Sequence, residues 1–439
     1  MKIVGLITEY NPFHNGHLYH IEKAKEVTGA DAVLVVMSGD FVQRGEPAIF
    51  PKEVRVQSAL SQGASGVFEL PVAYATGSGE IFATGAVGLL DALGCVDAIC
   101  FGAECNDLSL LTSISDLLVH EPEDFKQALK DGLKEGVSFP RAREEAIIRV
   151  LGEKEVLKEI LHNPNNILAI EYLKALIKLD SPIKPYVIQR EGAAYHEKSL
   201  GWRFDSATSI RQAIRREDVS CCEECLRQVR ESVPEAVFEI YGEYLREYGP
   251  ASWSDYSLLL KYRLMEACRE GYNLTGGLTG YLDVSESLAN RIDKHLEDFV
   301  DPMTFIQILK TKDLNYTRIS RSLLHILLSI RGADLQDFMA NGRVFYARLL
   351  GFRKEDKDLL GILKKSSRIP IISKLADAKK LLGDFYGKKE EGPFETTELA
   401  MKMLDQDVFA SELFDSVQGL KCGKTPAREL RKQIQIYKV

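Results

Sequence analysis

The sequence predicts an α/β fold in the first half of the chain, with a doubly wound and mainly parallel sheet, followed by a mainly α-helical second half. Three observations lead to this prediction. Short β-branched runs alternate with helical stretches over the first two hundred residues, glycines stand where helices should end, and strand signals fade beyond Ser220. Such alternation is typical of βαβ units, whose strands pair in parallel. Because 439 residues exceed what one core usually organises, we expect two domains, residues 1–220 and residues 221–439.

The elements follow from local patterns. The expected strands are Lys2–Thr8, Ala32–Met37, Gly66–Leu70, Ala98–Gly102 and Pro185–Arg190. The expected helices between them are Gly16–Thr28, Pro51–Gln62, Gly79–Leu93 and several from Leu108 to Leu179. Glycine is favoured just past a helix end, as at positions 29, 63 and 94. In the second half, apolar residues recur at helical spacing over Asp255–Glu270, Ser320–Ile330 and Lys357–Lys364.

Composition describes an ordinary globular chain. Apolar residues make up 45% and charged residues 27%, and no stretch approaches 18 uninterrupted apolar residues. The formal net charge of −8 argues against a protein that coats nucleic acid non-specifically, without excluding a local basic surface. The eight cysteines form no disulfide framework, and the cluster Cys221, Cys222 and Cys225 lacks a nearby fourth zinc ligand. We therefore expect a cytoplasmic protein with reduced thiols, no metal site, no membrane association and no disulfide-linked partner.

The segment TEYNPFHNGHLYH, from Thr8 to His20, directly follows the first strand and holds three of the eight histidines. In an open α/β sheet the ligand crevice lies outside the carboxyl ends of the strands, where this connection begins. His14 and His17 lie on one face of a helical first turn, and Gly16 between them permits close approach of a ligand. Imidazoles near a helix N-terminus suit phosphates and the charge that grows on a leaving pyrophosphate. The alternative is that these histidines are helix caps or core residues. The glycines do not form the dinucleotide-binding fingerprint G-x-G-x-x-G.

The four residues HNGH resemble the H-x-G-H (HIGH) signature of the nucleotidylyltransferase and class I aminoacyl-tRNA synthetase superfamily. A second stretch, SATSIR at 206–211, resembles the second phosphate motif of that superfamily, and no K-M-S-K-S element is present. Further motifs, in order MSGDFVQRGEPA, ELP, FGAE, PNNIL, YH and, in the second half, YTRISRSLLHILL, resemble the bacterial tRNA(Met) cytidine acetate ligase family over essentially the whole chain. This resemblance implies a Rossmann-like sheet of the nucleotidylyltransferase type.

The same resemblance implies a reaction and its residues. ATP and acetate would form acetyl-adenylate, and N4 of the wobble cytidine of elongator tRNA(Met) would take the acetyl group to give N4-acetylcytidine. His14, His17, Thr208 and Arg211 would be the catalytic phosphate contacts, and Mg²⁺ is expected with ATP. Arg44 is a further candidate partner for acetate or phosphate. The implied ATP contacts are Ile7, Thr8, Glu9, Tyr10, Asn11, Pro12, Phe13, His14, Asn15, Gly16, His17, Leu18, Tyr19, His20, Gly102, Asn165, Arg190 and Glu191. Gly102, Asn165, Arg190 and Glu191 also suit plain helix caps and surface charges.

For the tRNA, we predict contacts from Lys312, Arg318 and Arg321, where basic residues alternate with hydroxyls and Tyr316. Further basic clusters lie at 364–368 and in the tail from Lys421. Solvated helix faces explain these clusters equally well. Two other functions use the same phosphate motifs: an adenylyl- or cytidylyltransferase acting on a small phosphate ester, and an RNA-binding protein that senses ATP without chemistry.

Overall fold

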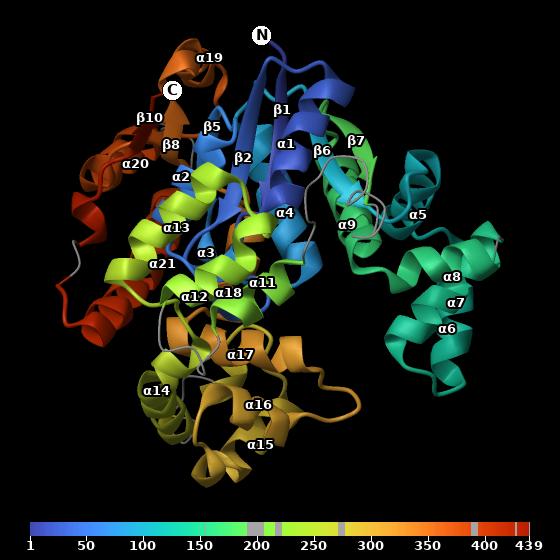
Figure 1. Cartoon of the computed structure of the whole chain (residues 1–439). Helices are drawn as coiled ribbons and strands as arrows, with labels where there is room; N and C mark the ends of the chain where they lie inside the picture. The colour runs from blue at the N-terminus through green and yellow to red at the C-terminus, as the bar shows by residue number, and fades with distance from the viewer. Residues whose placement is uncertain are drawn as a thin grey trace.

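The structure is a computed structural model of the chain, and it describes residues 1–152, 154–190, 206–215, 222–270, 277–387, 394–425 and 428–438. Its centre is one eight-stranded sheet with helices on both faces (Figure 1). The strand order is β10 (Gln435–Tyr437), β8 (Ala347–Arg353), β5 (Gly66–Leu70), β2 (Ala32–Ser38), β1 (Ile3–Thr8), β6 (Ala98–Ala103) and β7 (Lys184–Gln189), and β9 (Ile371–Ile372) pairs with β8. All pairs are parallel except β5 with β8. The expected mainly parallel, doubly wound sheet is therefore confirmed.

Alternate side chains of the central strands enter two separate cores. Val33, Val35 and Met37 pack on one face with α1 (Asn15–Thr28), α2 (Lys52–Ser61) and α13 (Glu235–Glu247). Leu34 and Val36 pack on the other face with α3 (Val72–Ala75), α4 (Gly79–Ala92) and α9 (Pro164–Leu179). A strand covered on both faces reads as a continuous apolar run, which is why AVLVVMS carries no polar alternation.

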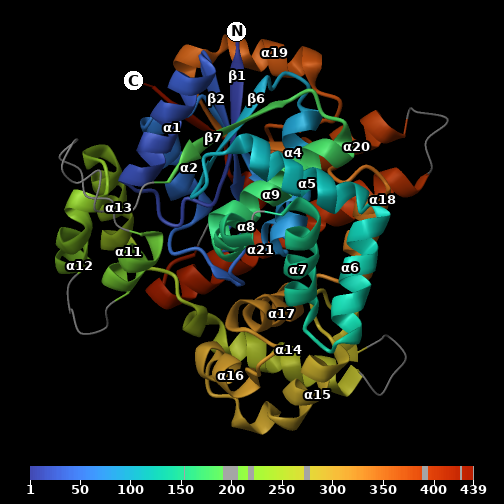
Figure 2. The same cartoon turned by 90° about the vertical axis from the view of Figure 1, so that its right-hand side faces the viewer.

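Helices fill the long connection from β6 to β7 and most of the second half. In the connection, α6 (Glu123–Lys134), α7 (Phe139–Leu151) and α8 (Lys154–His162) extend away from the sheet beyond α5 (Leu108–His120) (Figure 1, Figure 2). After β7, α11 (Ala207–Ile214) ends the first half. The second half contains α12 (Cys222–Val229), α14 (Ser257–Glu270), α15 (Glu286–Lys294), α16 (Pro302–Leu309), α17 (Tyr316–Leu328), α18 (Gly332–Ala340), α19 (Asp358–Ser366), α20 (Ala378–Tyr386) and α21 (Phe394–Cys422). The α14–α17 group lies beyond the carboxyl end of β1 (Figure 1).

The five predicted strands and the helices between them are present within one or two residues of the expected bounds. Strands β8, β9 and β10 of the second half were not predicted. β8 reads ARLLGFR, a short mixed run whose strand character arises from pairing with β5, almost three hundred residues earlier. The second half is mainly helical as expected, but it also completes the sheet of the first. The division at residue 220 stays a prediction.

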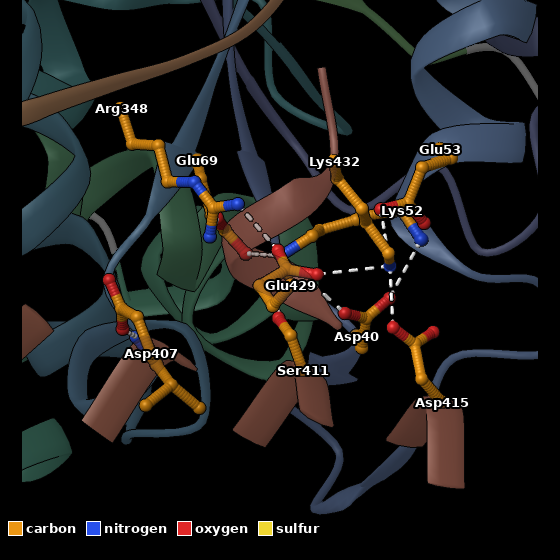
Figure 3. A network of polar contacts seen from close by, with 12 residues as sticks. Asp40, Lys52, Glu53, Glu69, Arg348, Asp407, Ser411, Asp415, Glu429 and Lys432 are labelled. Carbon is orange, nitrogen blue, oxygen red and sulfur yellow. Dashed lines mark hydrogen bonds and ion pairs between the residues drawn. The ribbon is translucent and has the colours of Figure 1, made fainter. Parts of the chain in front are cut away.

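A buried cluster of charges fixes the C-terminal segment to the sheet (Figure 3). The Lys52 ammonium, 1% exposed, lies 2.9 Å from Glu69, 3.7 Å from Asp40 and 2.5 Å from Glu429. Lys432 lies 2.6 to 3.0 Å from the carboxylates of Glu53, Asp415 and Glu429, and Arg348 pairs with Glu69 and Glu429. Buried charges persist only when paired, so this cluster holds α2, β5, β8 and the tail together.

Within the described residues, no helix is long and apolar enough to span a bilayer. The five cysteines with described side chains, at 95, 100, 105, 268 and 422, are free, and the described residues contain no group of three or more His, Cys, Asp or Glu suited to a metal ion. Cys221 and the side chains of Cys222 and Cys225 lie outside the described part of the chain.

Candidate functional site

The loop from Thr8 to His14 lies at the point where the winding of the sheet reverses. From β1 the chain goes to β2 and β5 on one side and later to β6 and β7 on the other, and open α/β sheets bind their ligands outside the carboxyl ends of the strands at such a reversal. The loop is sharply bent, with Tyr10 in the left-handed region (φ 48°) and a cis peptide between Asn11 and Pro12. The predicted position of the site is therefore a switch point of the observed fold.

A fully buried arginine fixes the base of this loop. The Arg55 guanidinium donates to the carbonyls of Glu9 after β1, Ser38 and Gly39 at the end of β2, and Phe50 just before α2. Sequence reasoning missed Arg55, because a single arginine in a predicted helix carries no signal of burial. It holds the segments after β1 and β2 in one arrangement.

His14 and His17 begin α1 as a reciprocal capping pair. The Nδ1 atom of His14 accepts the N–H of Gly16 at 3.0 Å, and Nδ1 of His17 accepts the N–H of His14 at 3.2 Å. The two rings lie 3.8 Å apart. Because a backbone N–H only donates, each neutral imidazole carries its proton on Nε2. The two histidines therefore cap the helix, as the alternative interpretation stated. This capping leaves both rings with Nε2–H donors at the helix N-terminus.

Burial keeps His17 and His20 neutral. Burial, the nearby His14 and the Arg190 guanidinium hold the pKa of His17 well below its usual value. Burial and Arg190 lower the pKa of His20 to about 4. At neutral pH these rings therefore offer hydrogen bonds rather than charge, and the positive charge comes from the neighbouring arginines.

The SATSIR motif contacts the loop that holds the HNGH motif, although two hundred residues separate Arg211 from Asn11. Ser206 caps α11, and Arg211, 7% exposed, donates to the Asn11 carbonyl at 2.6 Å and to the Thr208 hydroxyl at 3.2 Å. Its guanidinium also lies 3.7 Å from Glu46, on the strand β4 (Glu46–Pro47). The structure therefore brings His14, His17, Thr208 and Arg211 to one end of the sheet, as the sequence predicted; their roles in catalysis stay a prediction.

The other expected nucleotide contacts lie at the ends of β6 and β7 and at the start of α9. A Cβ atom on Gly102 would meet Cγ of Arg190 at 3.0 Å, so the Arg190 side chain runs over this glycine. Asn165 donates to Glu104 at 2.6 Å, and the same carboxylate accepts the N–H of Asn166. Arg190 is near enough to lower the pKa of His17, whereas the Asn165 amide is already engaged by Glu104. Glu191 lies outside the described residues.

Part of the predicted loop has a structural role. The Asn11 amide oxygen accepts the N–H of Ile49, the Phe13 carbonyl accepts the hydroxyl of Tyr241, and the Asn15 amide donates to the Glu231 carbonyl. These bonds attach the loop to the 49–50 segment and to the helices of the second half. A sequence match to a motif cannot separate such anchors from ligand contacts.

The expected tRNA contacts lie on and before α17. Lys312 and Arg318 are exposed, whereas the Arg321 guanidinium donates to Asp283 at 2.9 Å and is 15% exposed. The hairpin of β3 (Phe41–Val42) and β4 rests on the same helix, because Ser320 donates to the Gly45 carbonyl at 2.8 Å. In the tail, Lys421, Lys424 and Lys432 are all used in ion pairs. Lys312 and Arg318 are thus better placed than Arg321 to meet a phosphate.

Comparisons with known proteins agree on one family. The family model described as HIGH Nucleotidyl Transferase matches residues 1–427. The tRNA(Met) cytidine acetate ligase of Thermoanaerobacter sp. (strain X514) is 40% identical over 414 residues, covering 94% of this chain and 95% of its own. That of Acetivibrio thermocellus is 38% identical over 400 residues, covering 91% and 94%. The crystal structure of Thermotoga maritima TmcAL bound with alpha-thio ATP has a TM-score of 0.88 and 31% identity, with 100% of both chains covered.

Proposed function

The chain belongs to the HIGH nucleotidyl transferase family, and from this premise we propose that it is an ATP-dependent tRNA(Met) cytidine acetate ligase. The observation that carries the proposal is the meeting of the HNGH turn with Arg211 and Thr208 at the switch point of the sheet, in a chain that a relative of that name matches over 94% of its length. Acetate attacks the α-phosphate of ATP and pyrophosphate leaves. N4 of the wobble cytidine of elongator tRNA(Met) then takes the acetyl group and AMP leaves. We place this reaction in the cytoplasm, where tRNA and ATP are found.

The site is suited to the first step because it offers fixed donors rather than a nucleophile. The Nε2–H groups of His14 and His17 and the guanidinium of Arg211 stabilise negative charge on the phosphates as the bond to pyrophosphate breaks. Their positions are set before the substrate arrives, because His14, His17 and Arg211 all bond to backbone groups of the loop.

Mg²⁺ enters this scheme with ATP rather than at a resident site. The carboxylate of the loop, Glu9, faces the guanidinium groups of Arg44, Arg55 and Arg211, whose positive charge disfavours a divalent cation there. Mg²⁺ in such enzymes is held largely by phosphate oxygens and water. The residues around the loop therefore fit a magnesium–nucleotide substrate and not a protein-held metal.

We assign tRNA binding to the second half, residues 221–439. Arg318 and Lys312 supply charges for the phosphates of an anticodon loop, whose splayed bases are the usual target of RNA recognition. The contact of α17 with the Gly45 hairpin connects this surface to the nucleotide loop. Arg318→Ala weakens tRNA binding and flattens its salt dependence by about one phosphate contact. Arg321→Ala breaks the pair with Asp283 and therefore also lowers stability. Equal tRNA affinity of the wild type and Arg318→Ala refutes the assignment.

The reaction is tested with purified protein, ATP, magnesium, labelled acetate and unmodified tRNA(Met) transcript, followed by mass analysis of the nucleosides. Labelled acetylcytidine is expected, and it is lost in His14→Ala and in a transcript without the wobble cytidine. Pyrophosphate release that needs a phosphate ester instead of acetate indicates a metabolic transferase. ATP binding without pyrophosphate release indicates a sensor.

A further inference from the structure

The second step of the proposed reaction needs a proton acceptor. When N4 attacks the carbonyl carbon of acetyl-adenylate, an N–C bond forms, the C–O bond to AMP breaks, and N4 loses one proton. An exocyclic amine is a weak nucleophile whose lone pair is delocalised into the ring. The intermediate that it forms gives up its proton readily, so a carboxylate is a strong enough base to take it.

The histidines of the loop do not fill this role. In His14 and His17 the Nδ1 lone pair already accepts a backbone N–H and Nε2 carries a proton, so neither neutral ring has a lone pair to offer. The Nε2 atom of His20 is fully buried, which closes its path for releasing a proton to water.

The acids around the loop are mostly engaged. Glu46 pairs with Arg211 and Arg215, Glu104 holds Asn165 and the N–H of Asn166, and Asp40 lies inside the buried cluster with Lys52. Glu9 differs from them. It is the single acid between Ile7 and His20 and is partly exposed. Its carboxylate accepts one hydrogen bond, from the N–H of Gln43 at 2.8 Å, and no second one from any residue that the structure describes.

The surroundings of Glu9 suit an acceptor for an amine. It directly follows β1, four and seven residues before Phe13 and Gly16, at the carboxyl end of the sheet where the two phosphate motifs meet. Burial raises the pKa of Glu9, and the nearby Arg211, Arg44 and Arg55 limit the rise. Tyr172 of α9 is near enough for the charge of Glu9 to help raise the pKa of its hydroxyl, after burial. A carboxylate in this setting is more basic than one in water.

We propose that the Glu9 carboxylate is the general base that takes the proton from the cytidine N4 during acetyl transfer. This inference rests on the proposed function. N4 presents only N–H donors at its edge, so the same carboxylate also orients the amine before attack. After transfer, Glu9 returns the proton to water through its exposed side, and Arg44 and Arg211 beside it hold the AMP that leaves.

Glu9→Gln tests the proposal, because glutamine keeps the oxygen that accepts from Gln43 and removes only the base. Acetate-dependent exchange of labelled pyrophosphate into ATP measures adenylation. A single turnover of synthetic acetyl-adenylate with tRNA(Met) transcript measures transfer. Transfer in Glu9→Gln falls about a hundredfold or more, the usual contribution of a general base, while adenylation falls by less than about tenfold. Glu104→Gln is the matched control, and it lowers the two steps in parallel.

The pH profile separates a base from a positioning group. Transfer by the wild-type protein rises with pH along an acidic limb with a midpoint above 4.5, and Glu9→Gln lacks this limb. Glu9→Asp restores part of the rate together with the limb. Equal losses in both steps, or a limb that persists in Glu9→Gln, overturn the proposal. Failure of the wild-type protein to acetylate tRNA, with adenylation intact, refutes the proposed function instead.

Discussion

Gly45 is the point where the β3–β4 hairpin contacts α17, the predicted tRNA-binding helix. It lies between β3 and β4 with φ at 78°. A Cβ atom there would stand 2.3 Å from the nitrogen of Arg321 and 2.5 Å from the carbonyl carbon of Ser320, both in the backbone of α17. Gly45→Ala therefore cannot be absorbed by a side-chain rotation, and the hairpin must move away from the helix.

Gly45→Ala lowers stability for two reasons, and the same substitution at Gly29 measures one of them alone. The left-handed conformation costs a non-glycine residue about 1–2 kcal/mol, and forced overpacking adds roughly 1–3 kcal/mol. Gly29, just past the end of α1, has φ at 64° but no atom within 4 Å of a built Cβ. Gly29→Ala therefore loses only the stability that the left-handed conformation costs. We expect Gly45→Ala to be less stable than Gly29→Ala by about 1–3 kcal/mol.

Urea unfolding of the two variants and the wild type measures this difference. Acetylation of tRNA(Met) is measured beside it, because Arg44 and Glu46 flank the displaced glycine. We expect Gly45→Ala to lose acetylation at temperatures where it is still folded, and Gly29→Ala to keep it. Equal stability of the two variants within about 0.5 kcal/mol, or full activity of folded Gly45→Ala, refutes the reasoning that this hairpin is seated on α17.

Three further predictions concern the buried charges. Lys52→Met removes the ammonium group that pairs with the carboxylates of Asp40, Glu69 and Glu429, and it should lower the free energy of unfolding by about 3–5 kcal/mol in a urea titration. A loss under about 1 kcal/mol contradicts the buried pairing. Burial and nearby carboxylates raise the pKa of Asp407 and of Asp415 to about 7, so their stabilising share is present at low pH and is lost as pH rises through 7. Stability should therefore fall between about pH 4 and pH 7, the window between the ordinary and the raised pKa, and Asp407→Asn should reduce this slope; an unchanged slope argues against the raised pKa of Asp407. Arg211→Lys cannot reach both the Asn11 carbonyl and the Thr208 hydroxyl, and kcat/KM for ATP should fall about 10- to 100-fold in pyrophosphate exchange, whereas wild-type values would exclude Arg211 from the site.

Local patterns were enough for the core of the fold. The runs IVGLIT and AVLVVMS are buried on both faces and carry the β-branched residues of parallel strands, and the helix that begins at Asn15 ends at the glycine expected there. The HNGH turn was also readable, because spacing along one turn decides which side chains share a face. These features depend on neighbours within about ten residues, so the sequence alone determined them.

The tertiary structure decided which distant groups meet. Arg211 reaches the Asn11 carbonyl from two hundred residues away, β8 becomes a strand because β5 offers its edge, and Lys52 is buried because Glu69 and Glu429 lie beside it. The same holds for Glu9, whose neighbours come from three other segments of the chain. A charge is buried, exposed or made reactive by the partners that packing brings to it, and sequence spacing carries no record of partners so far apart.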